Sequence, residues 1–199
     1  MSQIITDINQ LDLSKKYSYA DYLKWQFDER VELIKGWIYK MSPGPSRKHQ
    51  KIEGDIFGSF WNYFKGKECE VYHAPFDVRL LKNKGQTNEE VETVVQPDIV
   101  VICNTNILDD KGCNGAPDLV VEVLSPSTMK KDFNEKYNIY EENGVKEYWL
   151  FHPELKIVET YVLKKQKFHL NLRLENANGV ITSPLFPDFK LDCGEVFVD

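Results

Sequence analysis

The chain has 199 residues, of which 42% are hydrophobic and 13% aromatic, and this fits a single globular domain with a substantial core. Its formal net charge of −6 argues against a strong overall attraction to nucleic acid but is compatible with local basic patches. The sequence contains no apolar run near the roughly 20 residues of a membrane helix and no signal-peptide pattern at its start, so we expect a cytoplasmic protein without a membrane segment.

The first predicted elements are a short helix and a hairpin. Ser18 is placed to cap a helix that runs to about Trp25. Residues 30–41 alternate in a way that favours two strands, with the turn at Lys35-Gly36.

A long helix is predicted over residues 47–64, ending before Gly66. Its hydrophobic stripe consists of Ile52, Ile56, Phe60 and Phe64. A strand over residues 71–81 and a polar loop over 82–93 should follow.

Two apolar strands dominate the middle of the chain, at residues 96–103 and around Glu122. The loop between them is rich in Asp and Gly, and a helix over 132–142 should follow the second strand and end at Asn143-Gly144. The remaining strands are expected at 147–151, 157–163, 168–174 and 180–181. This order predicts an α+β fold, a mixed and mainly antiparallel β-sheet flanked by helices, in one domain over 1–199.

Cysteine spacing argues against two common frameworks. Cys69, Cys103, Cys113 and Cys193 are scattered, with no Cys-x-x-Cys pair. A cysteine zinc site and a disulfide framework are therefore disfavoured, and free thiols are expected.

Glu122 is an acid within a run of Leu and Val that is typical of a strand buried on both faces. A carboxylate there costs several kcal/mol unless a positive group meets it. The sequence offers three solutions: a metal ion, Lys136, or both.

The chain has two Pro-Asp pairs, Pro97-Asp98 and Pro117-Asp118, and strand geometry separates them. In an antiparallel pair, the start of the first apolar strand lies opposite the end of the second, so Asp98 approaches Glu122. Asp118 is four residues from Glu122, roughly 13 Å along a strand, too far to share an ion easily. Oxygen ligands of this kind suit Mg²⁺ or Mn²⁺, with waters and a main-chain carbonyl completing the shell.

Lys136 shares a predicted helical face with Phe133, Tyr137 and Tyr140, which favours a position facing the sheet. The ordinary alternative is a surface lysine whose ammonium extends to solvent. Glu32 alternates with apolar neighbours in the first hairpin, where the ordinary alternative is a solvent-facing strand position.

Basic residues mark two candidate phosphate sites. Arg47, Lys48 and His49 lie at the start of the long helix, where free N–H groups favour an anion, and Lys130 follows the Glu122 strand.

Several segments together resemble a known family. They are Val31–Gly36, His49-Gln50, Gln96–Asp98, Gly115–Thr128, Lys136 and Gly144–Trp149. They resemble the Uma-two-type restriction endonucleases of the PD-(D/E)XK nuclease superfamily, over about residues 17–162.

The superfamily pattern is Pro-Asp on one strand and Glu-x-Lys on the next. Asp98 and Glu122 match its acids, Leu124 stands where the lysine is usual, and Lys136 on the following helix resembles the replacement. Glu32 matches a family acid. The resemblance implies a restriction-endonuclease-like core, phosphodiester hydrolysis and a homodimer.

The residues and the family resemblance leave two candidate functions. The first is a Mg²⁺- or Mn²⁺-dependent endonuclease acting on DNA, in which Asp98, Glu122 and the Val123 carbonyl hold the metal. Lys136 would then align the attacking water, with Glu32 in support. The second is a nuclease-like fold that binds nucleic acid or protein without cutting, favoured by the acidic charge and by Leu124.

Overall fold

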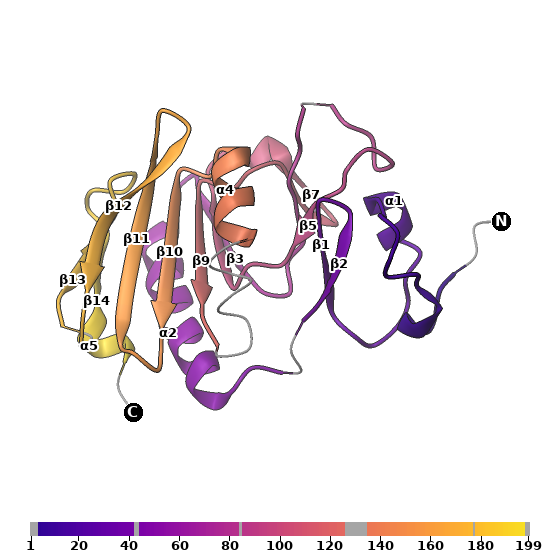
Figure 1. Ribbon diagram of the computed structural model, residues 1–199. Coiled ribbons are helices and arrows are strands. Elements are labelled where there is room, and N and C mark those ends of the chain that lie inside the picture. Colours follow the sequence, from indigo (N-terminus) through magenta and orange to yellow (C-terminus); the bar gives the residue numbers. More distant parts are fainter. Residues whose placement is uncertain (1–3, 42–43, 84, 126–134, 177, 198–199) are drawn as a thin grey trace.

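The computed structural model describes residues 4–41, 44–83, 85–125, 135–176 and 178–197. Two six-stranded sheets and a small two-stranded sheet form its framework. Figure 1 shows the larger helix α2 on one face of the main sheet and α4 on the other, with the second sheet toward the N-terminal part of the chain. None of the helices within the described ranges is long and apolar enough to span a bilayer.

The main sheet has the strand order β12-β11-β10-β9-β6-β3. Its strands are β3 (Glu70–His73), β6 (Ile99–Ile102), β9 (Leu119–Val123), β10 (Glu147–His152), β11 (Ile157–Lys164) and β12 (Lys167–Leu174). The β9–β10 pair is parallel, and the other neighbours are antiparallel. The mixed, mainly antiparallel sheet predicted from the sequence is therefore confirmed.

The second sheet has the order β2-β1-β5-β4-β8-β7. Its strands are β1 (Val31–Ile34), β2 (Trp37–Lys40), β4 (Val78–Arg79), β5 (Val94–Val95), β7 (Leu108–Asp109) and β8 (Gly112–Asn114). The predicted first hairpin is confirmed as the β1–β2 pair, which turns at Lys35 and Gly36.

Two sequence expectations about strands were wrong. The single strand expected over 71–81 is two strands in different sheets, because the chain leaves the main sheet after β3 at Pro75, which has no N–H to extend a ladder. The loop expected after β6 contains the short strands β7 and β8 and the 3₁₀ turn η2 (Thr105–Ile107). Strands this short carry too little alternation to be recognised from the sequence.

The helices begin and end close to the predicted residues. Helix α2 spans Arg47–Phe64 and buries the expected stripe, while α1 is only Tyr19–Tyr22 after Ser18. Helix α4 spans Tyr137–Asn143 and ends at the left-handed Gly144. The earlier part of the predicted 132–142 helix, including Phe133, lies outside the described residues. The remaining elements are η1 (Ile8–Gln10), β13 (Val180–Thr182), β14 (Lys190–Asp192) and α5 (Cys193–Val196).

The core consists of separate layers on the two faces of the main sheet. One layer packs α2 and the C-terminal elements against one face, and the other packs α4 and the second sheet against the opposite face. Because both faces are covered, β9 is buried at every residue, as its apolar composition predicts. A polar side chain on β9 therefore needs a partner inside the protein.

A disulfide joins Cys69 and Cys103, so the expectation of free thiols was wrong for these two residues. They directly flank the antiparallel β3–β6 pair, in which Glu70 lies opposite Ile102. A sequence separation of 34 residues conceals this adjacency. Cys113 and Cys193 are free and buried.

Gly112 allows a close approach between β8 and the chain before β4. It has φ +120°, and a Cβ there would lie 2.2 Å from the Asp77 carbonyl oxygen. We predict that Gly112→Ala lowers the free energy of unfolding by roughly 2–5 kcal/mol, from backbone strain and overpacking. Gly54→Ala is the control, since that helical position is open and Ala should stabilise it by up to about 1 kcal/mol. Urea unfolding measures both, and an unchanged Gly112→Ala midpoint would contradict the packing described.

Candidate active site

Glu122 lies in a buried polar cluster with Lys136, Glu32 and Tyr140. The Lys136 Nζ is 2.8 Å from Glu122 Oε1 and 3.0 Å from Glu32 Oε1, and the Tyr140 hydroxyl donates to Glu122 Oε1 at 2.8 Å. Glu32, Glu122 and Lys136 are at most 3% exposed. Lys136 therefore faces the acids as predicted, and the buried strand acid has its positive partner.

Three different elements supply this cluster. Glu122 projects from β9 toward the face that α4 covers, where Lys136 immediately precedes the helix and Tyr140 follows one turn later. Glu32 comes from β1 of the second sheet, so the solvent-facing alternative for this residue was wrong. The Gln96 backbone N–H also donates to Glu32 Oε1 at 2.9 Å. Burial, with the Glu122 charge adding to it, raises the pKa of Tyr140 well above its ordinary value, which keeps the hydroxyl a donor.

Asp98 lies in a second, more accessible cluster with His49 and Glu53. One ligand atom from each of these three residues lies within 4.8 Å of the others, so they form a group that could hold a metal ion. The His49 Nε2 is 3.4 Å from Asp98 Oδ2, and Nδ1 is 3.8 Å from Glu53 Oε2. Helix α2 supplies His49 and Glu53 one turn apart on the face that turns toward β6.

Burial and neighbouring charges perturb the acids and bases of this second cluster. Burial and then the Asp98 charge raise the pKa of Glu53 to about 7, and the charges of His49 and Arg30 act in the opposite direction. Burial lowers the pKa of His49, but the hydrogen bond and charge of Asp98 outweigh it and leave the pKa raised. Two carboxylates and an imidazole fit a divalent ion, with Mn²⁺ accepting the nitrogen more readily than Mg²⁺.

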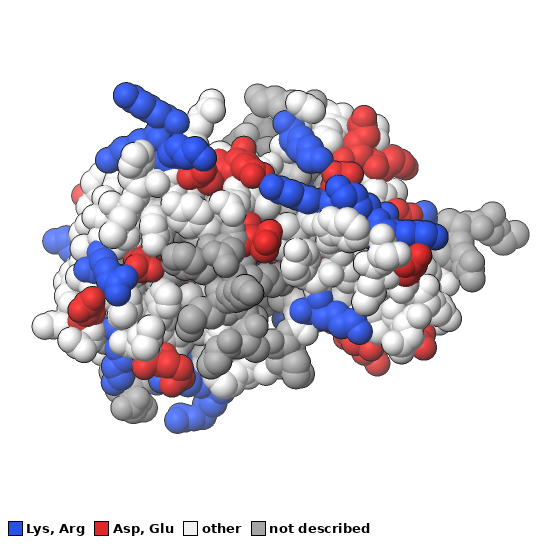
Figure 2. All heavy atoms as spheres, in the orientation of Figure 1, with Lys and Arg blue, Asp and Glu red and all other residues white. Residues whose placement is uncertain are grey.

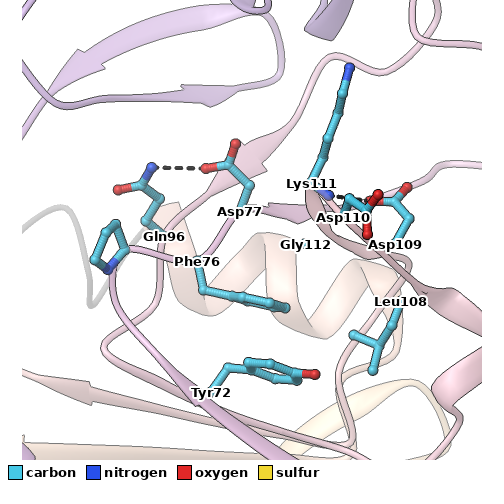
Figure 3. Close-up of a pocket in the computed structure, with 10 residues that line it drawn as sticks. Tyr72, Phe76, Asp77, Gln96, Leu108, Asp109, Asp110, Lys111 and Gly112 are labelled. Carbon is cyan, nitrogen blue, oxygen red and sulfur yellow. Dashed lines mark hydrogen bonds between the residues drawn. The ribbon is translucent and has the colours of Figure 1, made fainter.

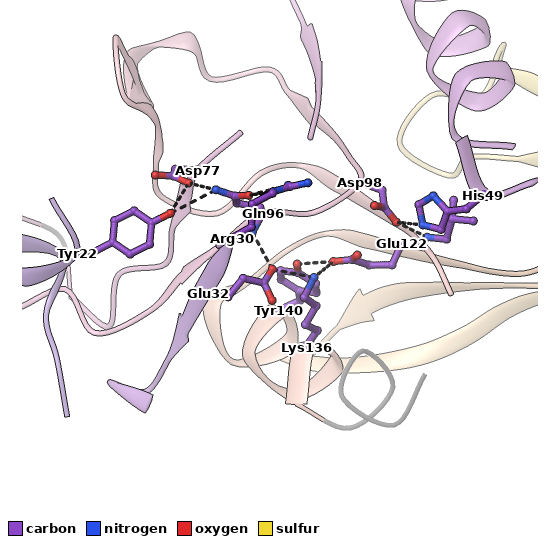
Figure 4. A network of polar contacts seen from close by, with 11 residues as sticks. Tyr22, Arg30, Glu32, His49, Asp77, Gln96, Asp98, Glu122, Lys136 and Tyr140 are labelled. Atoms are coloured by element: carbon purple, nitrogen blue, oxygen red, sulfur yellow. Dashed lines mark hydrogen bonds and ion pairs between the residues drawn. The ribbon is translucent and has the colours of Figure 1, made fainter. Parts of the chain in front are cut away.

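The two clusters meet at the end of β9. Ile99 pairs with Val121, so one step further Asp98 lies opposite Glu122, and the Val123 N–H donates to Asp98 Oδ2 at 2.7 Å. Figure 4 shows Asp98 beside His49, with Glu122 on the side toward Lys136 and Tyr140. Asp98 precedes β6, and its carboxylate contacts the Val123 N–H and His49 of α2, whereas Glu122 contacts Lys136 and Tyr140.

Asp118 lies at the other end of β9. Its carboxylate accepts from the Cys103 N–H at 2.7 Å and pairs with Lys146 at 2.6 Å. The antiparallel register therefore separates the two Pro-Asp pairs as the sequence predicts.

The candidate phosphate residues have mixed surroundings. Arg47 is exposed in the first turn of α2, Lys48 pairs with Glu154 at 3.3 Å, and His49 is directed to Asp98 instead of outward. Lys130 lies outside the described residues. In the described part of the face in Figure 2, lysines and arginines are interspersed with acidic side chains.

Sequence reasoning missed Glu53 and gave His49 a different role. The signal available was a His and a Glu four residues apart, which share one face of a helix. Many surface helices carry such pairs, and only the position of Asp98 across from that face distinguishes this one.

Comparisons with known proteins agree with this geometry. Residues 19–194 match the model of the Uma2 family, which is described as "Putative restriction endonuclease". The chain belongs to the Uma2 family.

Two further proteins are similar to this Uma2 chain. An uncharacterized protein from Synechocystis sp., slr1290, is 31% identical over 130 residues. That match spans 64% of each chain, less than two thirds of the curated relative. The structure of a putative nuclease of DUF820 from Anabaena variabilis has a TM-score of 0.69 at 20% identity, covering 90% of this chain and 97% of that one. At this identity the likeness shows the fold, which is the expected restriction-endonuclease-like α+β type.

The contact between Tyr140 and Glu122 gives a stability prediction for this Uma2 protein. Tyr140→Phe deletes a hydrogen bond to a buried charged group, so the free energy of unfolding should fall by about 1.5–3 kcal/mol. Tyr137→Phe is the matched control on the same helix, because the Tyr137 hydroxyl makes a 3.4 Å contact to the neutral Phe168 carbonyl. Its cost should stay below about 1 kcal/mol. Equal losses in the two variants, measured by urea unfolding, would argue against a charged partner for Tyr140.

Proposed function

We propose that this protein is a Mg²⁺- or Mn²⁺-dependent endonuclease that hydrolyses phosphodiester bonds in DNA. The observation that carries the proposal is the group of Asp98, His49 and Glu53, which could hold an ion, at the end of β9 where Glu122 pairs with Lys136. A purely structural cluster would need only Lys136, Glu32 and Glu122, whereas the arrangement also includes Asp98 and Glu53, two carboxylates that repel one another without a cation.

Asp98 is the central ligand in the proposed metal site. Glu122 and the Val123 carbonyl would supply oxygens from β9, and His49 and Glu53 would supply a nitrogen and an oxygen from α2. When bound there, a divalent ion polarises a phosphate oxygen and lowers the pKa of a coordinated water.

The residues of the buried cluster would position the reacting groups. Lys136 is held between Glu32 and Glu122, so its ammonium is preorganised without a conformational search. Placed there, it would align the attacking water and stabilise negative charge on the phosphate. Glu32 fixes the lysine from the second sheet, and Tyr140 fixes Glu122.

The family resemblance favours a homodimer on DNA. The cytoplasmic location stays a prediction, and the Cys69–Cys103 disulfide weighs against it because the reducing cytosol keeps most thiols free.

A second candidate function is a nuclease-like module that binds nucleic acid or protein without cutting. The complete enclosure of Lys136 between Glu32 and Glu122 favours it, since a buried triad can serve structure alone.

Metal dependence is the first test of the proposal. Mg²⁺ or Mn²⁺ should support plasmid cutting, and Asp98→Ala or Glu122→Ala should abolish it because both acids hold the ion. Calorimetry should show weakened Mn²⁺ binding in Asp98→Ala. Ca²⁺ should bind and support little cleavage, since its looser shell positions water poorly.

The control variant is Asp118→Ala, which removes the other Pro-Asp acid and should keep full metal affinity and cutting. If the wild-type protein at low salt cuts neither DNA nor RNA with any of these ions, the binding-module function is the correct one.

The role of Lys136 is tested by deleting its charge. Lys136→Met keeps the stem, so the protein should fold and bind metal, with cleavage reduced by roughly two to four powers of ten, the loss typical of a preorganised charge. Lys136→Arg should recover little, because the planar fork is longer and differently aimed. Lys146→Met, which removes an exposed lysine paired with Asp118, is the matched control and should cut normally. Full activity in Lys136→Met would assign the role to another residue.

A further inference from the structure

A pocket of about 440 Å³ opens between the two sheets on the β3–β4 side of the molecule, within the size range of small-molecule sites. Figure 3 shows its main components: the Tyr72 and Phe76 rings, the Asp77–Gln96 pair, and the turn that carries Asp109 and Asp110. None of these groups belongs to the proposed metal site.

The walls of the pocket are fixed by backbone contacts. The Cys113 N–H donates to the Asp77 carbonyl at 2.8 Å, and Gly112 leaves no room for a side chain against that carbonyl. The same β7–β8 hairpin is also held by the Arg79 side chain, which pairs with Asp109 at 2.7 Å. The cavity is thus preformed and needs no ordering to accept a ligand.

The floor of the pocket is aromatic. The Tyr72 and Phe76 rings are stacked, with centroids 4.3 Å apart and planes 11° from parallel. In Figure 3 the Phe76 ring lies between Tyr72 and the acidic groups. A ring supported from behind in this way offers a rigid flat surface for a planar ligand.

The polar side of the pocket accepts hydrogen bonds. Gln96 Nε2 at 2.8 Å and the Tyr22 hydroxyl at 3.3 Å both donate to Asp77 Oδ1. Within the described residues no hydrogen bond reaches Asp77 Oδ2, which keeps its acceptor capacity. Asp77, Asp109 and Asp110 outnumber the one lysine of the lining, Lys111, so a phosphate group is disfavoured here. The chemistry suits a flat, uncharged ligand with amino donors.

One residue connects the pocket to the candidate active site. Gln96 lines the pocket with its side chain, its backbone N–H donates to Glu32, and Glu32 holds Lys136. Gln96 also lies two residues before Asp98, so their Cα atoms are at most about 7 Å apart. A nucleotide whose phosphate reaches Asp98 would therefore have its base near Gln96.

We propose that this pocket receives one unpaired nucleobase of the substrate, stacked on Phe76, and that Asp77 selects bases with an amino group over thymine. The placement of the phosphate rests on the proposed nuclease function; the base site itself does not. A carboxylate accepts from the amino groups of cytosine, adenine or guanine, whereas thymine has a carbonyl oxygen at the position where cytosine carries its amino group. An extruded or single-stranded base is required, because a stacked base pair cannot enter a cavity of this size.

Free nucleosides test the base site without phosphate, metal or cutting. Calorimetric or NMR titration of the full chain should show saturable binding of deoxycytidine and deoxyadenosine, and at least about fivefold weaker binding of thymidine. Phe76→Leu should weaken deoxycytidine binding by at least about fivefold, as expected for the loss of one base–aromatic stack.

Two variants keep the test decisive. Asp77→Asn retains an oxygen for Gln96 and Tyr22 but adds an N–H donor, so the preference for deoxycytidine over thymidine should disappear or reverse. Trp61→Leu removes an exposed aromatic ring on α2, outside the pocket, and should leave binding unchanged. If Phe76→Leu and Asp77→Asn both bind deoxycytidine with the affinity of the wild-type protein, the proposal is overturned.

Cutting assays separate this proposal from the nuclease function. Wild-type cutting of DNA combined with no saturable nucleoside binding would reject the base site and leave the nuclease intact. Specific nucleoside binding without cutting under any ion would support the base site and reject the nuclease.

Discussion

A carboxylate on a strand that is buried on both faces is the constraint on which the centre of this structure depends. Glu122 cannot be ionised there without a positive partner, and the structure supplies Lys136 at 2.8 Å. The lysine is itself buried and needs a second acid, which β1 provides through Glu32 at 3.0 Å. One buried charge therefore requires the helix after β9 and the second sheet to meet at the same place.

The need to neutralise Glu122 on β9 also places the groups of the proposed metal site. The same strand end carries Val123, whose N–H fixes Asp98, and Asp98 connects to His49 and Glu53 on α2. The buried cluster of Glu32, Glu122 and Tyr140 therefore orients Lys136, which would act on the phosphate. The more accessible cluster of Asp98, His49 and Glu53 is open to an ion. Tight packing around β9 holds both sets of groups with little freedom to reorganise, which is the condition for electrostatic preorganisation.

Strong local patterns made much of this predictable from the sequence. The apolar run around Glu122 predicted a buried strand, the antiparallel register selected Asp98 over Asp118, and the aromatic face of the following helix indicated Lys136. What could not be predicted depends on contacts between distant segments: two-residue strands have no periodicity, and Glu53 is distinguished from any helical acid only by facing Asp98. The Cys69–Cys103 pair was hidden for the same reason, since only strand pairing brings the two thiols together.

The central claim is that Asp98 holds a divalent ion at the end of β9. Crystals grown with Mn²⁺ and measured near the manganese absorption edge would locate the ion by its anomalous scattering. We predict a peak within about 2.5 Å of an Asp98 carboxylate oxygen, with further ligands drawn from His49, Glu53 and Glu122. A map with no peak at Asp98, or with its peak at Asp118, would contradict the account.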